Sequence, residues 1–321
     1  MGLAAKHLGN REGAYNSITA GILLTFISFY YLIASLIGNP LIIYPFNVLM
    51  SVWVGLIAAF QGLYIILNKK IKNKKYDLHF VKNEDFTFYH EMKRKVSHLV
   101  GILLIVCYFW ISIPLFIDIQ YLLNLVEKMG INIWGMVIIP VNMMYVPRMI
   151  TLFAMFCTGY FIIIPDILRV FDFKLTMFKM FEKIMREKEK NAIGPHVCLV
   201  IGCLISTLLI PEDLIVVSGI IIAIFSDSVA SLVGRKFGKH KLPFSKRTGK
   251  SYEGLLGGFL TAILVSFPIL LLGYNLMTSI ILSLIGGLVF SVIDILTPII
   301  TDNYLNPILI CTGMYIIFLF I

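Results

Sequence analysis

Charged residues are scarce in this chain. Among its 321 residues, Asp, Glu, Lys and Arg together make up 14%, whereas 59% are hydrophobic and the mean hydropathy is +0.89. This composition excludes an ordinary soluble domain. The apolar residues form long continuous runs rather than alternating patterns, which disfavours a transmembrane barrel. We therefore expect an all-α, polytopic integral membrane protein.

Cysteine pairs, repeats and nucleic-acid-binding modules are also missing. All five cysteines lie in apolar runs without a CxxC pair, so they are predicted to be core residues rather than disulfides or zinc ligands. No repeat or midplane cluster of charges occurs, which disfavours a transporter. No soluble recognition module accompanies the net charge of +9, so this charge is assigned to membrane topology and to anionic lipids, with no nucleic acid as partner.

The apolar runs predict about nine membrane spans. One run contains Pro140 and Pro147 and forms either one kinked span or two short ones. With one span there, 25 of the 27 Lys and Arg residues fall on one side, so the positive-inside rule favours an odd count and a cytoplasmic N-terminus. The predicted spans are 18–37, 41–67, 97–117, 133–165, 194–210, 213–234, 253–272, 276–297 and 304–321.

A basic linker divides these spans into two parts. Residues 1–92 form a two-helix extension plus the linker, and residues 93–321 form a seven-helix catalytic core. The two spans of the extension lack convergent polar groups, so we expect an accessory role for it. The host would be the cell membrane or the endoplasmic reticulum membrane, with the active site facing the cytoplasm.

One dense polar stretch interrupts the apolar sequence between Phe225 and Phe259. Asp227 lies inside a predicted span, where an acid is costly without a partner or a metal. A glycine-containing loop with seven Lys or Arg residues follows, and Glu253 opens the next span. This loop is not a Walker A motif, but TGKSYEG offers backbone amides and a lysine at a helix start, which suits phosphate. Acids beside a basic loop predict a metal–triphosphate site.

Other polar residues gather at the predicted cytoplasmic ends of the spans. Lys95 and His98 share a helical face at the start of the third span, and Asp166 and Arg169 can pair at the end of the fourth. Arg186 and Glu189 precede the fifth span. In a short turn near the C-terminus, Asp302 and Asn303 carry oxygen atoms of the kind that bind Mg²⁺.

Six short motifs, taken in order, resemble the CTP-dependent polyprenol and dolichol kinase family, which includes phytol kinases and CTP-using diacylglycerol kinases. They are RKVSH, PDILR, MREKE, SDSVASLVGRKFGKHK, GKSYEG and TDNYLNP, and they span roughly residues 93–310. The resemblance departs from the family pattern at Thr301, where the family has an aspartate, and at Ser226, where it often has glycine.

The resemblance implies a lipid kinase that moves the γ-phosphoryl group of CTP to the hydroxyl of a membrane alcohol. Isoprenoid alcohols such as dolichol come first as substrates, and diacylglycerol-like alcohols second. Asp227 and Glu253 would hold Mg²⁺, with Asp302 and Asn303 as additional ligands, and His98 or Asp166 would orient or deprotonate the alcohol. The residues that would bind CTP or complete the cytoplasmic mouth are Arg235, Gly238, Lys239, Lys246, Lys250, Ser251, Gly254, Lys95, Arg186 and Glu189.

The main alternative is a CDP-lipid synthase, which transfers a nucleotidyl rather than a phosphoryl group. Such enzymes share the GRxFGKHK and K-T-x-E-G features. They also carry a KD pair and an HGG-x-x-DR-like end near the C-terminus, which this sequence lacks. A transporter is a remote alternative, and a homo-oligomer is compatible with either enzyme.

Overall fold

The computed structural model describes residues 9–37, 42, 46–70, 88–98, 121, 125, 128, 146–171, 189, 191–243, 249–296 and 300–321. Within these ranges the regular structure is helical, apart from one isolated β-bridge between Lys241 and Ser251. The helices are α2 (Arg11–Leu36), α3 (Phe46–Lys70), α4 (Phe88–His98), α7 (Val146–Phe171), α8 (Pro195–Leu209), α9 (Asp213–Phe237), α10 (Tyr252–Leu270), α11 (Leu276–Leu296) and α12 (Asp302–Phe318).

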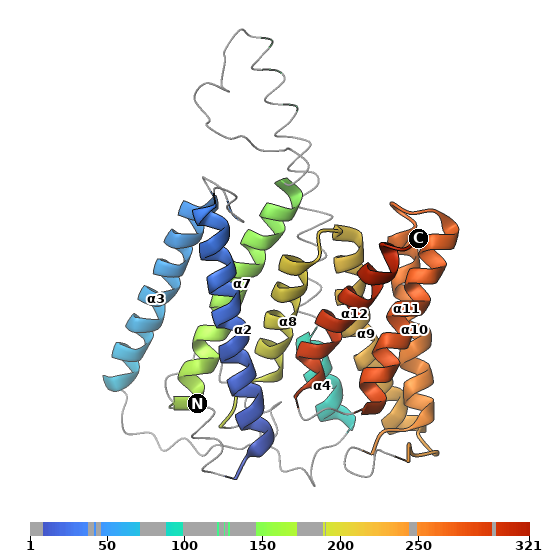
Figure 1. The fold of residues 1–321 in the computed structure, drawn as a ribbon. Helices are drawn as coiled ribbons and strands as arrows, with labels where there is room; N and C mark the ends of the chain where they lie inside the picture. The colour runs from blue at the N-terminus through green and yellow to red at the C-terminus, as the bar shows by residue number, and fades with distance from the viewer. Residues whose placement is uncertain are drawn as a thin grey trace.

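The long helices run up and down in one bundle (Figure 1). The starts of α2, α8, α10 and α12 and the ends of α3, α7, α9 and α11 all lie at the lower end in this view, together with α4. We call this the basic end, because the Lys and Arg residues of the described stretches 235–243 and 249–250 lie there, around the end of α9 and the start of α10. Arg148 is one of the two basic residues that the topology prediction does not place on the Lys- and Arg-rich side. It lies at the opposite end of the bundle, at the start of α7.

Six of the described helices are long and apolar enough to cross a membrane: α2, α3, α7, α9, α10 and α11. Apolar α8 has only 15 residues and α12 has 17. The all-α, polytopic class is therefore confirmed. The nine-span count and the cytoplasmic N-terminus stay predictions, because residues 99–117 of the predicted third span lie outside the described residues.

Helix α7 extends past the end of the predicted fourth span. That span was expected to end at residue 165, but α7 accommodates Pro165 and continues to Phe171. Pro147 stands in its first turn, where a missing N–H removes no intrahelical hydrogen bond. The rest of the predicted span, 133–145, lies outside the described residues.

Helix α9 lies at the centre of the core and packs most extensively against α10. Small residues allow the two backbones to approach closely. A β-carbon added to Gly254 would lie 2.6 Å from the carbonyl oxygen of Ala230, and one added to Gly258 would lie 3.0 Å from the β-carbon of Ala230. This close crossing sets the position of the loop that joins α9 to α10.

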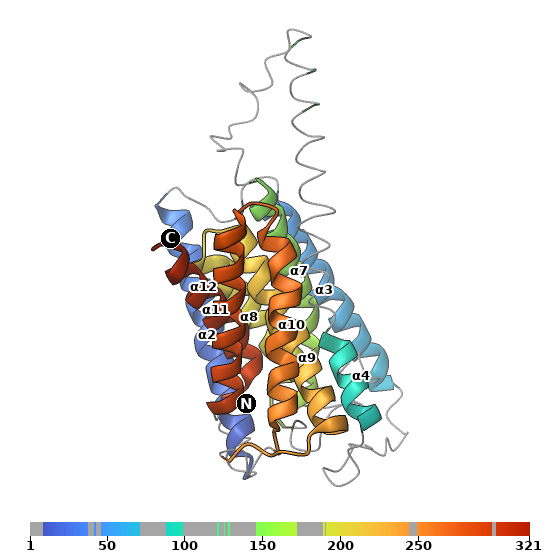
Figure 2. The same ribbon diagram turned by 90° about the vertical axis from the view of Figure 1, so that its right-hand side faces the viewer.

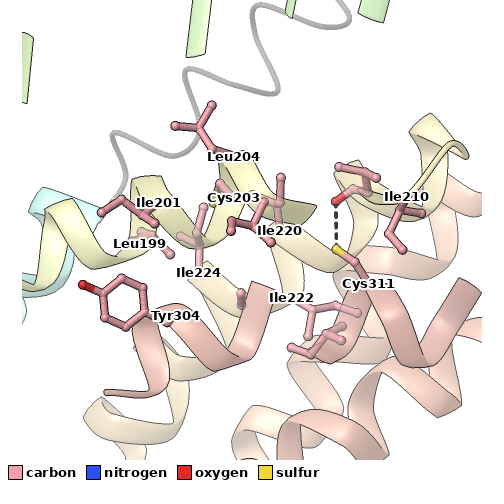
Figure 3. Packing of buried hydrophobic residues seen from close by; sticks show 14 of the residues in the cluster. Leu199, Ile201, Cys203, Leu204, Ile210, Ile220, Ile222, Ile224, Tyr304 and Cys311 are labelled. Carbon is pink, nitrogen blue, oxygen red and sulfur yellow. Dashed lines mark hydrogen bonds between the residues drawn. The ribbon is translucent and has the colours of Figure 1, made fainter. Parts of the chain in front are cut away.

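A second packing centre joins α8, α9 and α12 (Figure 3). A β-carbon on Gly219 would lie 2.4 Å from the sulfur of Cys311, and the Cys311 thiol donates to the carbonyl oxygen of Val216 at 3.6 Å. Cys198, Cys203 and Cys311 are buried and free, and Cys157 is half-buried and free. The prediction of unpaired core cysteines is confirmed for Cys198, Cys203 and Cys311, whereas Cys157 is unpaired but only half-buried, and Cys107 lies outside the described residues.

The glycine contact between α9 and α10 makes a stability prediction. Gly254→Ala should lower the free energy of unfolding by about 1–3 kcal/mol, because the new methyl group meets the backbone oxygen of Ala230. Gly257→Ala is the matched control in the same helix, since its β-carbon would meet Val233 at an ordinary 3.4 Å. Thermal unfolding in detergent checks both variants, and equal melting temperatures would contradict the close-packing account.

Candidate active site at the basic end

A buried ion pair joins α4 to α9. The ammonium group of Lys95 contacts the carboxylate of Asp227, and both side chains are largely buried. Figure 2 shows α4 beside the lower half of α9, which is the segment that carries Asp227. The contact supplies the partner that an acid inside an apolar helix needs.

Glu91 provides a second link between α4 and α9. Its side chain is almost fully buried. The carboxylate accepts a hydrogen bond from Arg94 on its own helix at 2.7 Å, and it lies 3.1 Å from the guanidinium group of Arg235 at the end of α9. Burial disfavours the charge of Arg94, but Glu91 and Glu189 outweigh this effect and raise its pKa. Sequence reasoning missed Glu91 because it stands in a polar stretch; its spacing of four residues from Lys95 was the available signal.

Lys250 precedes α10 and interacts with acids from three helices. Its ammonium group donates to Oδ1 of Asp294 on α11 at 2.6 Å and to the backbone oxygen of Asp294 at 3.1 Å. It also lies 4.0 Å from Oδ2 of Asp302 on α12. Burial disfavours the charge of Lys250, but Asp302 and Asp294, with a smaller effect of Asp227, outweigh it and raise its pKa. Lys250 is therefore a cation at neutral pH.

Asp294 was not among the predicted site residues. It lies in the last turn of α11 and is buried, with Lys250 as its partner. The available signal was an acid near the end of an otherwise apolar run, which is the same signal that singled out Asp227.

A short backbone bridge fixes the base of the basic loop. Leu242 N–H donates to the carbonyl of Lys250, and Tyr252 N–H donates to the carbonyl of His240, both at 3.0 Å. Gly249 has a φ of +68°, a conformation that favours glycine. These contacts set the position from which Lys250 reaches the acids. The tip of the loop, which includes Lys246, lies outside the described residues.

Glu253 binds the loop backbone. Its carboxylate accepts from the N–H groups of Lys239 and His240, each at 3.1 Å, and lies 2.7 Å from Nδ1 of His240. Asp227 is paired with Lys95, so these two predicted metal ligands face different partners. The contacts of Glu253 favour a positioning role over the predicted metal-binding role.

Gly238, Ser251 and Gly254 pack where α9 ends and α10 begins. Ser251 is the buried N-cap of α10 and accepts from Gly254 N–H at 3.2 Å. A β-carbon on Gly238 would lie 2.1 Å from the carbonyl oxygen of Gly234. The three residues shape the junction, and their predicted role in CTP binding would be indirect.

Asp166 belongs to a clamp between α7 and α8. It is buried and accepts from Arg169 Nε and from Gly194 N–H, both at 2.8 Å. Arg169 in turn donates to the carbonyl oxygens of Ala192, at 2.6 Å, and Glu189, at 3.2 Å. The predicted pair of Asp166 and Arg169 is confirmed. A carboxylate so engaged is poorly placed to deprotonate an alcohol.

The remaining predicted residues have varied positions. Glu189 lies 3.7 Å from Arg94, and Lys239 is exposed on the loop. His98 is the last residue of α4, but its side chain lies outside the described residues, as does all of Arg186.

The predicted short turn at residues 301–303 was wrong. Asp302 and Asn303 instead form the first turn of α12, because Thr301 is its N-cap and accepts from Asn303 N–H at 3.4 Å. The carboxylate of Asp302 is well placed there, since the N-terminal end of a helix favours negative charge.

The described residues do not contain a group of three or more His, Cys, Asp or Glu side chains arranged to hold a metal ion. Asp227 and Asp302 nevertheless act on the same ammonium group of Lys250. Their oxygen atoms are hard donors of the kind that Mg²⁺ takes, and Mg²⁺ commonly uses only one or two carboxylates together with substrate phosphates. The donor set therefore fits an ion that is bound together with a nucleotide.

Comparisons with known proteins identify the family of this chain. The model of the Cytidylyltransferase family matches residues 84–299, which include α4, the basic loop and α11. The chain belongs to this family. It is 29% identical to the uncharacterized protein RP860 of Rickettsia prowazekii (strain Madrid E) over 239 residues, which are 72% of this chain and 95% of that protein. No solved structure matches the chain.

A second relative bears on the kind of enzyme. Over 80 residues, the chain is 38% identical to CTP-dependent diacylglycerol kinase 1 of Schizosaccharomyces pombe. This stretch is 25% of the chain and 35% of the relative. The family match and this relative confirm the resemblance to CTP-dependent lipid enzymes that the motifs indicated.

The contacts of Glu253 generate a prediction about the loop. Glu253→Ala should speed amide hydrogen exchange at residues 239 and 240 by roughly 3- to 10-fold, because their N–H groups lose their acceptor. Glu212→Ala is the control, since Glu212 accepts from the Tyr274 hydroxyl at 3.0 Å near the other end of α9. Unchanged exchange in Glu253→Ala would show that this carboxylate does not hold the loop.

Proposed function

We propose that this protein is a CTP-dependent kinase that transfers the γ-phosphoryl group of CTP to the hydroxyl of a membrane lipid alcohol. The observation that carries the proposal is Lys250, a protonated lysine beside the basic loop, held against Asp294 and Asp302 where apolar helices end. The family match and the similarity to a CTP-dependent diacylglycerol kinase support CTP as the donor.

Phosphoryl transfer requires little covalent chemistry from a protein. The enzyme has to align the hydroxyl with the γ-phosphorus and to stabilise negative charge on the phosphoryl oxygens. Lys250 and Arg235 lie on the two flanks of the basic loop and would contact the triphosphate from both sides. Exposed Lys239 would add to this charge, with Lys246 in the part of the loop outside the described residues.

Mg²⁺ would be held by Asp227 and Asp302 together with the phosphates of CTP. When bound, the ion neutralises charge on the nucleotide. Lys95 holds Asp227 in place, and the rest of the α4–α9 contact fixes the position of this pair.

The acceptor hydroxyl would reach the basic end from the membrane leaflet while its chain remains in lipid. The motif resemblance favours isoprenoid alcohols, and the similarity to the fission-yeast enzyme favours diacylglycerol. The carboxylate of Asp166 already accepts hydrogen bonds from Arg169 and Gly194, which leaves His98 as the candidate for orienting the hydroxyl. The basic end would face the cytoplasm in either the cell membrane or the endoplasmic reticulum membrane.

A CDP-lipid synthase is the second candidate, and the family match favours it as well. That enzyme would transfer the cytidylyl (CMP) group of CTP to the phosphate of phosphatidate and release pyrophosphate. The missing KD pair and HGG-x-x-DR-like end weigh against it.

Two labels on CTP separate these reactions. Purified protein in detergent with Mg²⁺ is given CTP labelled at the γ-phosphate and at the cytosine, with dolichol, diacylglycerol or phosphatidate as acceptor. The proposal predicts γ label alone in the lipid product of an alcohol acceptor, and greater transfer from CTP than from ATP. Cytosine label in lipid would establish the synthase, and no transfer to any acceptor would overturn both.

Lys250 gives the sharpest single-residue prediction for this activity. Lys250→Ala should lower kcat/KM for CTP by about 10²- to 10³-fold, as expected for losing a preorganised cation at developing charge. Lys236→Ala removes the same charge from the last turn of α9, where Lys236 is exposed and lies 5.3 Å from the ring centroid of Phe237. That control should remain within about twofold of wild type. Equal losses in the two variants would mean that Lys250 contributes only general positive charge.

A further inference from the structure

We propose that Asn16 of α2 is a positioning residue for the active site, because it holds the first turn of α12 and thereby the pair of Asp302 and Lys250. This inference rests on the proposed function for its kinetic consequence. Helix α2 lies outside the family match, which begins at residue 84. The proposal therefore concerns a part of this chain beyond the matched family region.

Asn16 binds α12 at two points. Its side-chain Oδ1 accepts from the backbone N–H of Thr301 at 2.9 Å, and its backbone oxygen accepts from the hydroxyl of Tyr304 at 3.2 Å. Thr301 is the N-cap of α12, and Tyr304 is a fully buried residue in the first turn. The two contacts fix both the start and the orientation of that turn.

Helix α2 is itself anchored before it reaches α12. Ser17 accepts from the backbone N–H of Ile193 at 3.3 Å. A β-carbon on Gly13 would lie 2.6 Å from the β-carbon of Ala192, so the backbone of α2 lies against this segment. Arg169 binds the carbonyl oxygen of Ala192, which ties the same segment to α7. Asn16 therefore projects from a helix whose position is already determined.

The turn that Asn16 holds carries a residue of the proposed site. Asp302 follows Thr301 directly, and its Oδ2 lies 4.0 Å from the ammonium group of Lys250. Without Asn16, the partly buried N–H of Thr301 loses its side-chain acceptor, and a helix end without such partners frays. Asp302 then no longer holds Lys250 in place, so binding of the triphosphate weakens.

The position of α3 supports assigning this role to α2 alone. Helix α3 packs against α7, where Trp53 Nε1 donates to the carbonyl oxygen of Cys157 at 3.3 Å. The sequence predicted one accessory extension of two helices, whereas the contacts give its two helices different surroundings.

The test uses the full-length protein and three variants. Asn16→Ala should raise KM for CTP by about 3- to 10-fold, with kcat and the KM of the lipid within about twofold of wild type. Asn16→Asp keeps the Oδ acceptor and should restore KM for CTP. Asn10→Ala is the matched control, because Asn10 accepts one backbone N–H, that of Gly13, also at 2.9 Å. It should leave KM for CTP near the wild-type value.

Hydrogen exchange at residues 300–305 tests the anchoring independently of catalysis. Faster exchange in Asn16→Ala, but not in Asn10→Ala or Asn16→Asp, supports the proposal, even if wild-type protein transfers no phosphoryl group and the proposed function fails. Unchanged exchange in Asn16→Ala overturns it. An equal rise of KM for CTP in Asn16→Ala and Asn10→Ala also overturns it, since that result reports general loosening of α2.

Discussion

Asp227 imposes the main physical constraint on this molecule, because it places a carboxylate inside a long apolar helix. Lys95 satisfies it with a buried ion pair, and this pair brings the amphipathic helix α4 against α9. Glu91 and Arg235 extend the contact toward the end of α9. A buried ion pair adds little net stability compared with apolar packing, but removing one partner is strongly destabilising. The pair is thus better understood as fixing geometry than as strengthening the fold.

The rest of the site follows from how α9 meets its neighbours. Small residues let α10 approach α9 closely, and the β-bridge at the loop base then presents Lys250. Because the helices run up and down, the end of α11 and the start of α12 meet at the same level and supply Asp294 and Asp302. Helices that satisfy their own backbones in lipid thereby assemble a charged site at the membrane surface, as proposed for a nucleotide-dependent lipid kinase.

Much of this arrangement could be predicted from the sequence, because lipid penalises polar groups and makes exceptions visible. Asp227 and the basic loop were identified for that reason. The direction of a side chain was not predictable, so the contact of Glu253 with the loop backbone was not foreseen. Glu91 was missed because acids are unremarkable in a polar segment. The contact between Asn16 and Thr301 joins residues 285 apart, and no local pattern encodes it.

A double-mutant cycle on Lys95 and Asp227 tests the central claim most directly. The measurement is the free energy of unfolding in detergent for Lys95→Ala, Asp227→Ala and the double variant. If the pair fixes α4 against α9, each single variant loses about 3–5 kcal/mol, because it leaves an uncompensated buried charge. The free energy of unfolding of the double variant should then be no lower than that of the less stable single variant. Losses that simply add would show that the two charges are not coupled, and would contradict the account.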